Sequence, residues 1–458
     1  MLYKLFISRY GIFCFVFLII QQLIVCSSTL WLTHLVISVQ TGQQIWINLL
    51  LFLLSLSLPY FPGAAASIML SQWRQITIGK YIDAFISKKK NAITLWSQKN
   101  AKEEQTAFLT AEGQETLKNT LTYFYDLCAT GLNVGFNILV LSAVVEPKYA
   151  IGYGLGLVLA GLLFKFQKNK QKQLAALAQL SRVSLVKILL NAWDNILIGN
   201  HYNFNLWNKE TKHRFEISRN SNVHAETLQS LVSIGIAFTT LVPVFIVIIL
   251  HVSQHLHEPA ILSIFVVTLP RLFGVLNYTY ELLTLLFQWT THQEKLAGVR
   301  KILSETLNES LPERIRWAKI SFYKGTTPQN IFSLTDLMPL TKIPGRLTLR
   351  GENGTGKSSI LMLLKEKLGE DAFYLPAKGD LFFQIDTSSF SSGETAKSYL
   401  EELQRAVPEK ILLLDEWDAN LDPLKREQLS QIIDTLSHRQ CIIEVRHSDH
   451  PQKNPWLF

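Results

Sequence analysis

The chain has 458 residues, of which 48% are hydrophobic, 11% aromatic and only 17% charged. This composition is too apolar for a soluble enzyme of this length, so we expect a membrane part and a soluble part. The net charge of +8 does not indicate nucleic acid as a partner, because the basic residues are scattered between apolar runs and form no stripe. Four widely spaced cysteines, without a CxxC or Cys/His cluster, argue against a disulfide framework or a cysteine-based zinc site.

Segments that can cross a membrane come first in the chain. A bilayer core takes about 20 apolar residues per helix. Six segments meet this length, at roughly 10–38, 45–70, 122–145, 149–166, 228–251 and 259–289. The first segment has no small-residue cleavage site and is longer than a signal-peptide core, so we expect it to remain as a membrane helix.

The connections between these segments differ in charge. Lysines and arginines precede the first segment and follow the second and the fourth, whereas the connections 41–44, 146–148 and 251–259 contain one lysine between them. Short cytoplasmic loops are enriched in Lys and Arg, so both termini are predicted to face the cytoplasm, at the inner membrane of a bacterial cell. The cytoplasmic connections 71–121 and 167–227 lack proline and are rich in helix formers, which predicts that they extend the membrane helices.

A different pattern begins near residue 315, where short β-like runs alternate with Gly and Pro turns. There GENGTGKSS, residues 351–359, matches GxxxxGK[ST] between an apolar strand and a helix. Lys357 can reach the β and γ oxygens of a nucleotide, and the Ser358 hydroxyl can ligate Mg²⁺. A glycine-rich turn is the alternative, but the strand and helix favour ATP. The predicted nucleotide-binding residues of this loop are Gly351, Asn353, Gly354, Gly356, Lys357, Ser358 and Ser359.

Two adjacent carboxylates end the apolar run ILLL at 411–414. Such a run is typical of a buried parallel strand. Asp415 is therefore a candidate to hold Mg²⁺ through water, and Glu416 is a candidate general base for the attacking water. The alternative is a strand that runs into an acidic turn without further function.

Two further short patterns flank this strand. In FSSGE, residues 390–394, Ser391 and Glu394 form a capping box, while an exposed Ser-Ser-Gly at a helix N-terminus also binds anions. His447 follows the strand CIIEVR, at a sheet edge where a histidine can contact a γ-phosphate. A helix cap and a surface histidine are the alternatives, so the order of the motifs decides between them.

That order resembles the ATP-binding cassette (ABC) family, from about residue 316 to 458. FSSGE stands at the family's signature sequence, ANLD (419–422) at its D-loop and RHS (446–448) at its switch histidine. With six preceding segments, the whole chain looks like an exporter-type half-transporter. The resemblance implies a homodimer with two ATP molecules and Mg²⁺ at its interface, where the signature of one copy closes over the ATP of the other.

The resemblance also assigns roles to individual residues. It implies that Lys357, Glu416 and His447 act in catalysis and that Ser358 and Asp415 bind Mg²⁺. Tyr323 is placed to stack on adenine, with Trp317 as a substitute. Further nucleotide contacts are implied for Ser391, Ser392, Gly393 and Asp422.

The sequence departs from the family pattern in two places. Ala377 occupies the usual glutamine position of the Q-loop, with Gln384 as a candidate substitute. The interval from Lys357 to Phe390 is too short for the family's helical subdomain. We therefore predict an unusually small cassette, and slow or weakly coupled hydrolysis is one alternative for it. The retained Lys357, Asp415, Glu416 and His447 argue against a dead site.

One segment of the membrane part resembles a branch of the family. LSQWRQITIGKYIDAF, residues 70–85, is similar to the segment after the second span in bacterial peptide-uptake permeases and peroxisomal fatty-acyl half-transporters. Trp73, Arg74, Thr77 and Tyr81 carry the likeness. An interfacial Trp-Arg anchor is the alternative.

Polar residues inside the predicted spans are candidates to line a substrate cavity. An arginine in a membrane costs at least ~2.5 kcal/mol on insertion scales, so Arg271 in the sixth span should face a wet cavity or a partner. Asn133 and Asn137 share a helical face of the third span. A cavity role for Arg271 implies a cargo with an anionic group, while an internal ion pair or snorkelling is the alternative.

We therefore predict a multidomain membrane protein. An all-α six-helix transmembrane domain with long cytoplasmic helix extensions spans 1–304, a linker spans 305–315, and a small α/β P-loop nucleotide-binding domain spans 316–458. The predicted function is ATP-hydrolysis-driven export or flipping of a peptide, lipid or other amphipathic substrate by alternating access. The alternatives are an importer of peptides, a non-transporting membrane ATPase that regulates through dimerisation, and a proton-driven carrier with a vestigial cassette.

Overall fold

The computed structural model describes residues 3–90, 92–96, 98, 105–106, 108–144, 146–304, 311–377, 381–384, 392–406, 410–419 and 421–446. The chain divides into two compact units. The helical unit comprises Met1–Phe85 and Ala107–Ser304, and the sheet unit comprises Ile86–Thr106 and Glu305–Phe458.

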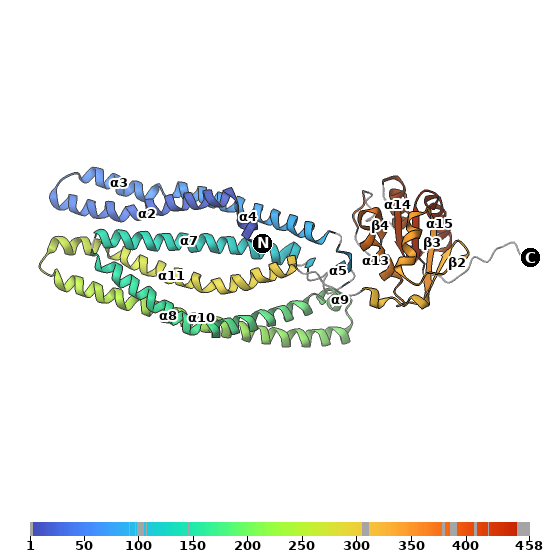
Figure 1. Cartoon of the computed structure of the whole chain (residues 1–458). Coiled ribbons are helices and arrows are strands. Elements are labelled where there is room, and N and C mark those ends of the chain that lie inside the picture. Colours follow the sequence, from blue (N-terminus) through green and yellow to red (C-terminus); the bar gives the residue numbers. More distant parts are fainter. Residues whose placement is uncertain are drawn as a thin grey trace, which may run out of the picture. The chain divides into compact units, whose positions relative to one another are not determined.

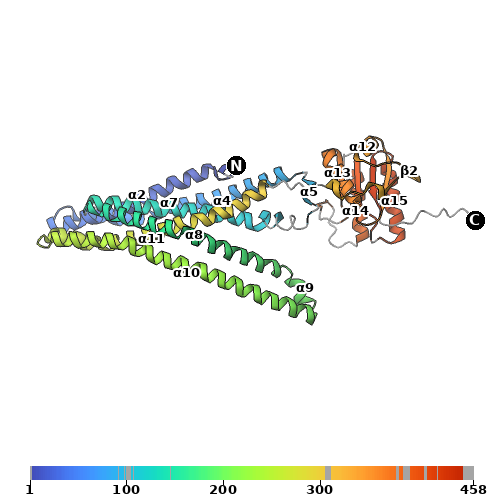
Figure 2. The same cartoon turned by 60° about the horizontal axis from the view of Figure 1, so that its bottom comes forward.

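The helical unit consists of long helices joined by short connections (Figures 1 and 2). In chain order its elements are α1 (Tyr3–Phe6), α2 (Arg9–Thr41), α3 (Ile45–Ser57), α4 (Tyr60–Lys89), the π-helix η1 (Phe108–Glu112), α7 (Gly113–Val144), α8 (Lys148–Leu189), α9 (Ala192–Leu197), α10 (His201–Gln254) and α11 (Pro259–Ser304). Helices α8 and α10 lie side by side in both views, and they form the most extensive helix pair of the unit.

Five of these helical stretches are long and apolar enough to cross a membrane, among the residues that the structure describes. They are α2, α3 together with α4, α7, α10 and α11. The predicted fourth span falls in α8, which bends by 48° between Lys148–Leu163 and Lys165–Leu189. The predicted number of six is reached only if the bent α8 counts as one span.

The residues of the 70–85 segment form a packing stripe on α4. The Trp73 indole donates to the carbonyl oxygen of Phe6 at 2.7 Å, and the Thr77 hydroxyl donates to that of Leu5 at 3.4 Å. Tyr81, four residues further on, donates to the carbonyl oxygen of Phe108 in η1 at 3.2 Å. All three side chains are buried, because a spacing of four places them on one helix face. Trp73 therefore packs inside the helical unit, against the chain before α2.

The polar residues predicted to line a cavity have partners inside the helical unit. The Asn133 amide donates to Gln22 Oε1 of α2 at 2.8 Å, and the Asn137 amide donates to the Asn133 carbonyl oxygen at 2.8 Å. Arg271 donates through Nη2 to Ser28 Oγ of α2 at 2.8 Å. Hydrogen bonds between helices stabilise their packing where water is absent, so Asn133 connects α7 to α2 and Arg271 connects α11 to α2, while the bond of Asn137 stays within α7. Arg271 has a hydroxyl as partner, not the ion pair that was the alternative.

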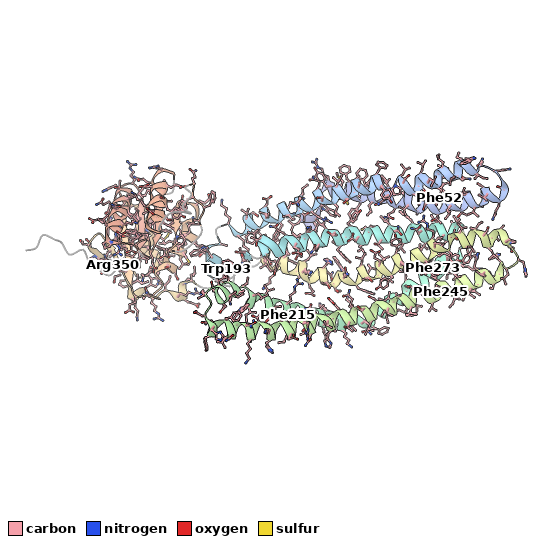
Figure 3. All side chains as sticks on the ribbon, turned by 180° about the vertical axis from the view of Figure 1, so that it is seen from behind. Phe52, Trp193, Phe215, Phe245, Phe273 and Arg350 are labelled. Carbon is pink, nitrogen blue, oxygen red and sulfur yellow. The ribbon has the colours of Figure 1, made fainter. Side chains whose placement is uncertain are left out.

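Aromatic packing joins the last two long helices. Phe245 of α10 and Phe273 of α11 meet edge to face, with ring centroids 6.1 Å apart and planes at 76° (Figure 3). This is the arrangement that aromatic quadrupoles favour.

The sheet unit contains one six-stranded sheet in the order β2-β1-β3-β6-β5-β4. Strands β3, β6, β5 and β4 are parallel, while β1 pairs antiparallel with β2 and β3. The strands are β1 (Ile320–Lys324), β2 (Thr327–Gln329), β3 (Gly345–Gly351), β4 (Ala372–Leu375), β5 (Ile411–Asp415) and β6 (Cys441–Val445). The helices are α5 (Ile93–Trp96), α12 (Leu334–Leu337), α13 (Lys357–Leu368), α14 (Ser392–Ala406) and α15 (Pro423–Ser437), with 3-10 turns η2 (Leu311–Arg314), η3 (Trp317–Lys319), η4 (Met338–Lys342) and η5 (Gly369–Asp371).

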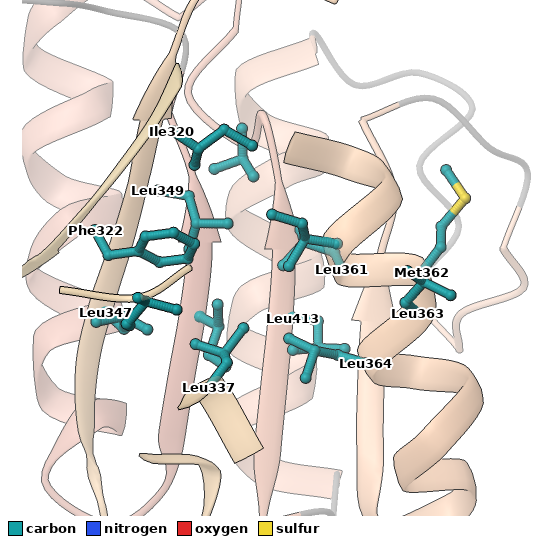
Figure 4. Packing of buried hydrophobic residues seen from close by; sticks show 14 of the residues in the cluster. Ile320, Phe322, Leu337, Leu347, Leu349, Leu361, Met362, Leu363, Leu364 and Leu413 are labelled. Atoms are coloured by element: carbon teal, nitrogen blue, oxygen red, sulfur yellow. The ribbon is translucent and has the colours of Figure 1, made fainter. Parts of the chain in front are cut away.

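The core between α13 and the sheet explains why the middle strands are apolar. Leu347 and Leu349 of β3 and Leu413 of β5 pack in one buried cluster with Leu361 and Leu364 of α13 (Figure 4). Every residue of β5 and β6 is buried, as expected for central strands covered on both faces.

One segment falls outside its predicted domain. Residues 86–106 comprise the last turn of α4 and the chain that leads toward α7, and they were predicted to extend the membrane helices, yet they belong to the sheet unit. Ile93 of α5 packs against the core cluster of Figure 4, and the Trp96 ring meets the Tyr374 ring edge-on at 5.9 Å. Lys90 forms an ion pair with Glu370 at 2.8 Å. The free energy gained by burying Ile93 against this core therefore outweighs that of continuing α4 as a helix beyond Lys89.

Candidate nucleotide site

The loop between β3 and α13 requires glycine at two positions. Gly354 and Gly356 have φ of 81° and 96°, in the left-handed region that residues with a side chain rarely adopt. A Cβ on Gly356 would also lie 2.7 Å from the carbonyl oxygen of Arg314. A Cβ on Gly351, where β3 ends, would lie 2.6 Å from the carbonyl oxygen of Lys319. The bare backbone of this loop can approach a phosphate closely, as the motif requires.

Lys357, the first residue of α13, folds its side chain back into this loop. Its Nζ donates to the carbonyl oxygens of Gly351 at 2.6 Å and Glu352 at 3.1 Å. The lysine is only 7% exposed, whereas Asn353 and Gly354 of the same loop are exposed. A buried positive charge at the N-terminus of a 12-residue helix, under an open loop, attracts an anion to that loop. Ser359, in the first turn of α13, is half-buried.

The two predicted Mg²⁺ ligands meet although 57 residues separate them in sequence. The Ser358 hydroxyl donates to Asp415 Oδ1 at 3.0 Å. Burial raises the pKa of the Asp415 carboxyl, which is only 5% exposed, and the hydrogen bonds from Ser358 and Tyr374 partly oppose that shift. A hydroxyl beside a buried carboxylate at the end of β5 is the oxygen pair that holds Mg²⁺ in P-loop sites.

Glu416 follows Asp415 with an unusual backbone conformation. Its φ is 46°, a value that among the described non-glycine residues only Gln44 shares in the positive range. The Glu416 N–H donates to the carbonyl oxygen of Val445 at 3.0 Å, which fixes the turn against the end of β6. Such a conformation costs about 1–3 kcal/mol and is found mainly at functional sites. The strain lies at the position predicted for the general base.

A buried glutamate lies next to this turn in β6, and it was not predicted from the sequence. Glu444 of β6 is fully buried and accepts hydrogen bonds from Arg346 at 3.0 and 2.8 Å, from Thr348 at 2.7 Å and from the Trp417 indole at 2.8 Å. Arg446 adds a contact at 2.9 Å. Although burial acts to raise the pKa of Glu444, the hydrogen bonds and charge of Arg346 and the charge of Arg446 lower it.

This network holds the residue after the candidate base. Trp417 is buried, with its indole bound to Glu444 and the Arg446 guanidinium 5.5 Å from its ring centre. The signal in the sequence was the single charge inside the apolar strand CIIEV. The register between β3 and β6 places Thr348 directly beside Glu444 in the sheet.

Tyr374 is a second residue that the sequence analysis missed. Its hydroxyl donates to Asp415 Oδ2 at 3.0 Å, while Ser358 occupies Oδ1. The Tyr374 ring also meets the Trp96 ring of α5, with centroids 5.9 Å apart and planes at 88°. One tyrosine therefore links the candidate Mg²⁺ ligand to the segment that connects α4 to α7. Ala377, which stands at the Q-loop glutamine position, is exposed.

Other predicted residues lie elsewhere or have other partners. Tyr323 is half-buried under the Arg350 guanidinium, 5.2 Å from its ring centre, and Trp317 stacks on Phe322. Asp422 caps α15 by accepting from the Lys425 N–H at 2.8 Å.

The predicted signature and switch are only partly described. Ser392 and Gly393 open α14, but their side chains are outside the described residues, as are Ser391 and His447 altogether. Gln384 is exposed, and its N–H donates to Glu402 Oε1 at 3.0 Å. Between β4 and α14 the described residues, 376–377 and 381–384, form neither helix nor strand.

The fold is that of an ABC exporter. The chain is similar to a bacterial Atm1-family ABC exporter solved with ATP bound, at 12% sequence identity and a TM-score of 0.64, over 96% of this chain and 92% of that chain. No family model and no curated protein sequence matches it. The fold and the five apolar helical stretches identify a multi-pass membrane protein.

Proposed function

We propose that this chain is a half-transporter that uses ATP hydrolysis to export or flip a peptide, lipid or other amphipathic substrate. The observation that carries the proposal is the contact between Ser358 and Asp415, beside the buried Lys357 and the strained Glu416. These four groups come from two separate stretches of sequence, 357–358 and 415–416, and meet at the carboxyl edge of a parallel sheet, where open α/β folds bind nucleotides. In the similar structure, ATP is bound.

The proposed chemistry assigns a role to each group. Ser358 and, through water, Asp415 would hold Mg²⁺, which neutralises charge on the β and γ oxygens. Lys357 would bind the same oxygens. Glu416 would take a proton from water as the water oxygen attacks the γ-phosphorus and the bond to the β-γ bridging oxygen breaks. ADP and phosphate are the products.

Two copies would be needed to complete the site. The ATP would be covered by a second copy through its Ser391, Ser392 and Gly393. In the first copy, His447 and Asp422 would face the ATP, and Tyr323 would contact adenine. Closure and release of this homodimer would switch a cavity in the helical unit between two openings. We place the transmembrane domain at 1–304, except for residues 86–106, which belong to the sheet unit, and the nucleotide-binding domain at 316–458. Both termini would lie in the cytoplasm of a bacterial cell.

Coupling between the units would run through Tyr374. The exposed Ala377 removes the usual Q-loop glutamine, whereas Tyr374 touches both Asp415 and Trp96. Because Trp96 belongs to the connection between α4 and α7, a movement of that connection would reach the Mg²⁺ ligand in one step.

A non-transporting membrane ATPase that regulates through dimerisation is the second candidate. The short interval from Lys357 to Phe390 and the alanine at position 377 favour it, since a smaller cassette offers less surface to couple to the helical unit. The two candidates differ in one respect: a transporter moves cargo, and a regulator does not.

The test uses the full chain in lipid discs and in sealed vesicles. ATPase activity is measured with and without Glu416→Gln against a panel of peptides and lipids, and cargo movement is measured in vesicles with ATP outside. We expect hydrolysis that Glu416→Gln lowers about 10²–10⁴-fold and that one cargo class stimulates. Hydrolysis without any cargo movement would instead support the regulator.

A further inference from the structure

A group of metal-binding side chains lies far from the nucleotide site, where two connections of the helical unit meet. Glu146 follows α7, while His251 and His255 lie in and just after the last turn of α10. Their ligand atoms all lie within 4.8 Å of one another. The two histidines are four residues apart, so they project from the same face of the helix end.

His251 lacks the partners that a buried imidazole normally has. It is 3% exposed, and neither ring nitrogen makes a hydrogen bond to a residue that the structure describes. Its Nδ1 lies 3.4 Å from Glu146 Oε2, but without hydrogen-bond geometry. The rings of Tyr149 and Phe265 lie against it, with centroids 6.0 and 5.5 Å away. Buried polar groups without partners are rare, which indicates that a ligand satisfies this one.

The other two residues are oriented by neighbours. Nδ1 of His255 lies 3.2 Å from Glu258 Oε1, and a carboxylate on one ring nitrogen leaves the other nitrogen free to ligate. The Lys148 ammonium lies 3.4 Å from Oε1 of Glu146, so the Oε2 atom remains on the side of His251. Lys148 is half exposed and also donates to Gln254, so water screens its charge from the cluster.

We propose that Glu146, His251 and His255 bind a zinc ion, with water as the fourth ligand. Two imidazoles and a carboxylate form a ligand set that zinc favours over Mg²⁺ and Ca²⁺. Tetrahedral zinc with bonds of about 2.0–2.2 Å needs its ligand atoms roughly 3.4 Å apart, so the atoms, which now lie within 4.8 Å of one another, would have to move closer when the ion binds. The ion would fasten the connection between α7 and α8 to the end of α10. Because these two connections contain only one lysine, Lys148, and no arginine, the site would face away from the cytoplasm.

The experiment measures zinc in full-length protein purified without a histidine tag. The protein in lipid discs is stripped with a chelator, dialysed against micromolar zinc and analysed by mass spectrometry for metal content. We expect about one zinc per chain in the wild type and at least tenfold weaker binding in His251→Gln and in His255→Gln. The matched control is His257→Gln, because His257 is exposed on the same connection and outside the cluster.

A second readout covers loss of folding in the variants. Zinc should raise the thermal unfolding midpoint of the wild type and of His257→Gln, and it should not raise that of His255→Gln. Cobalt in place of zinc should give the visible absorption of a four-coordinate site. No zinc in the wild type, or zinc that both His251→Gln and His255→Gln retain, would overturn the proposal. Neither result depends on ATP hydrolysis.

Discussion

The sheet unit and the helical unit differ in how far a short sequence pattern determines a contact. In the sheet unit, Ser358 and Asp415 were paired from their motifs, and they meet at 3.0 Å across 57 residues of sequence. In the helical unit, Asn133 and Arg271 were recognised as polar residues in apolar helices, but their partners Gln22 and Ser28 were not foreseen. A phosphate loop is defined by backbone geometry that few sequences satisfy, whereas many side chains can share a helix face.

The largest expected effect tests the phosphate loop. Lys357→Ala should reduce ATPase activity by about 10²–10³-fold, because it removes a buried donor that a γ-phosphate needs. Steady-state hydrolysis with ATP titration measures the change. Lys367→Ala is the control, since Lys367 is exposed on the same helix and should leave the rate unchanged. An equal loss of ATPase activity in both variants would show that substitutions in α13 destabilise the helix and would contradict a specific role for Lys357.

The next effect tests the network under the candidate base. Glu444→Gln leaves Arg346 buried without its main counter-charge, which should lower the free energy of unfolding by about 3–5 kcal/mol. Thermal unfolding at neutral pH measures this, with the exposed Glu427→Gln as control.

The same glutamate makes a prediction about pH. The folded state lowers the pKa of Glu444 below its ordinary value of 4.5. Its contribution to stability is therefore fully present above that value and is lost as the pH falls through the lower pKa of the folded state. Wild-type protein should lose stability on acidification below pH 4.5 more steeply than Glu444→Gln. Parallel curves for the two proteins would contradict the role assigned to the network.

A smaller effect tests the link through Tyr374. Tyr374→Phe keeps the ring against Trp96 but removes a hydrogen bond to the Asp415 carboxylate, a contact that contributes about 1.5–3 kcal/mol. We expect ATPase activity to fall roughly 10–100-fold with a weaker apparent affinity for Mg²⁺. The exposed Tyr202→Phe is the control. If Tyr374→Phe changed neither quantity, Asp415 would not need this partner.

The smallest effect belongs to the helical unit. A double-mutant cycle on Gln22 and Asn133 should give a coupling of about 0.6 kcal/mol, the average for hydrogen bonds between membrane helices. Unfolding of the full chain in detergent measures it. Arg271→Gln should alter transport only if the arginine also contacts cargo, so unchanged transport would leave it as a partner of Ser28 alone.

Sequence reasoning succeeded where the chain itself constrains the geometry. The glycines at 354 and 356 adopt positive φ values, and the apolar run before Asp415 is a fully buried central strand. Sequence reasoning failed where the partners of a residue come from distant elements. The segment of α5 was predicted to extend a membrane helix, because a four-residue helix is too short to show a periodic pattern. Tyr374 was missed because one tyrosine in a strand is ordinary until the fold brings Asp415 beside it.

The most direct test of the account is the mass of the working particle. Native mass spectrometry measures the mass of full-length Glu416→Gln protein and of the wild type, both in lipid discs saturated with ATP and Mg²⁺. The account predicts two chains and two nucleotides per particle, with dimers that dissociate at the sheet units once the wild type has hydrolysed its ATP. A particle of one chain that hydrolyses ATP at the full wild-type rate would contradict it.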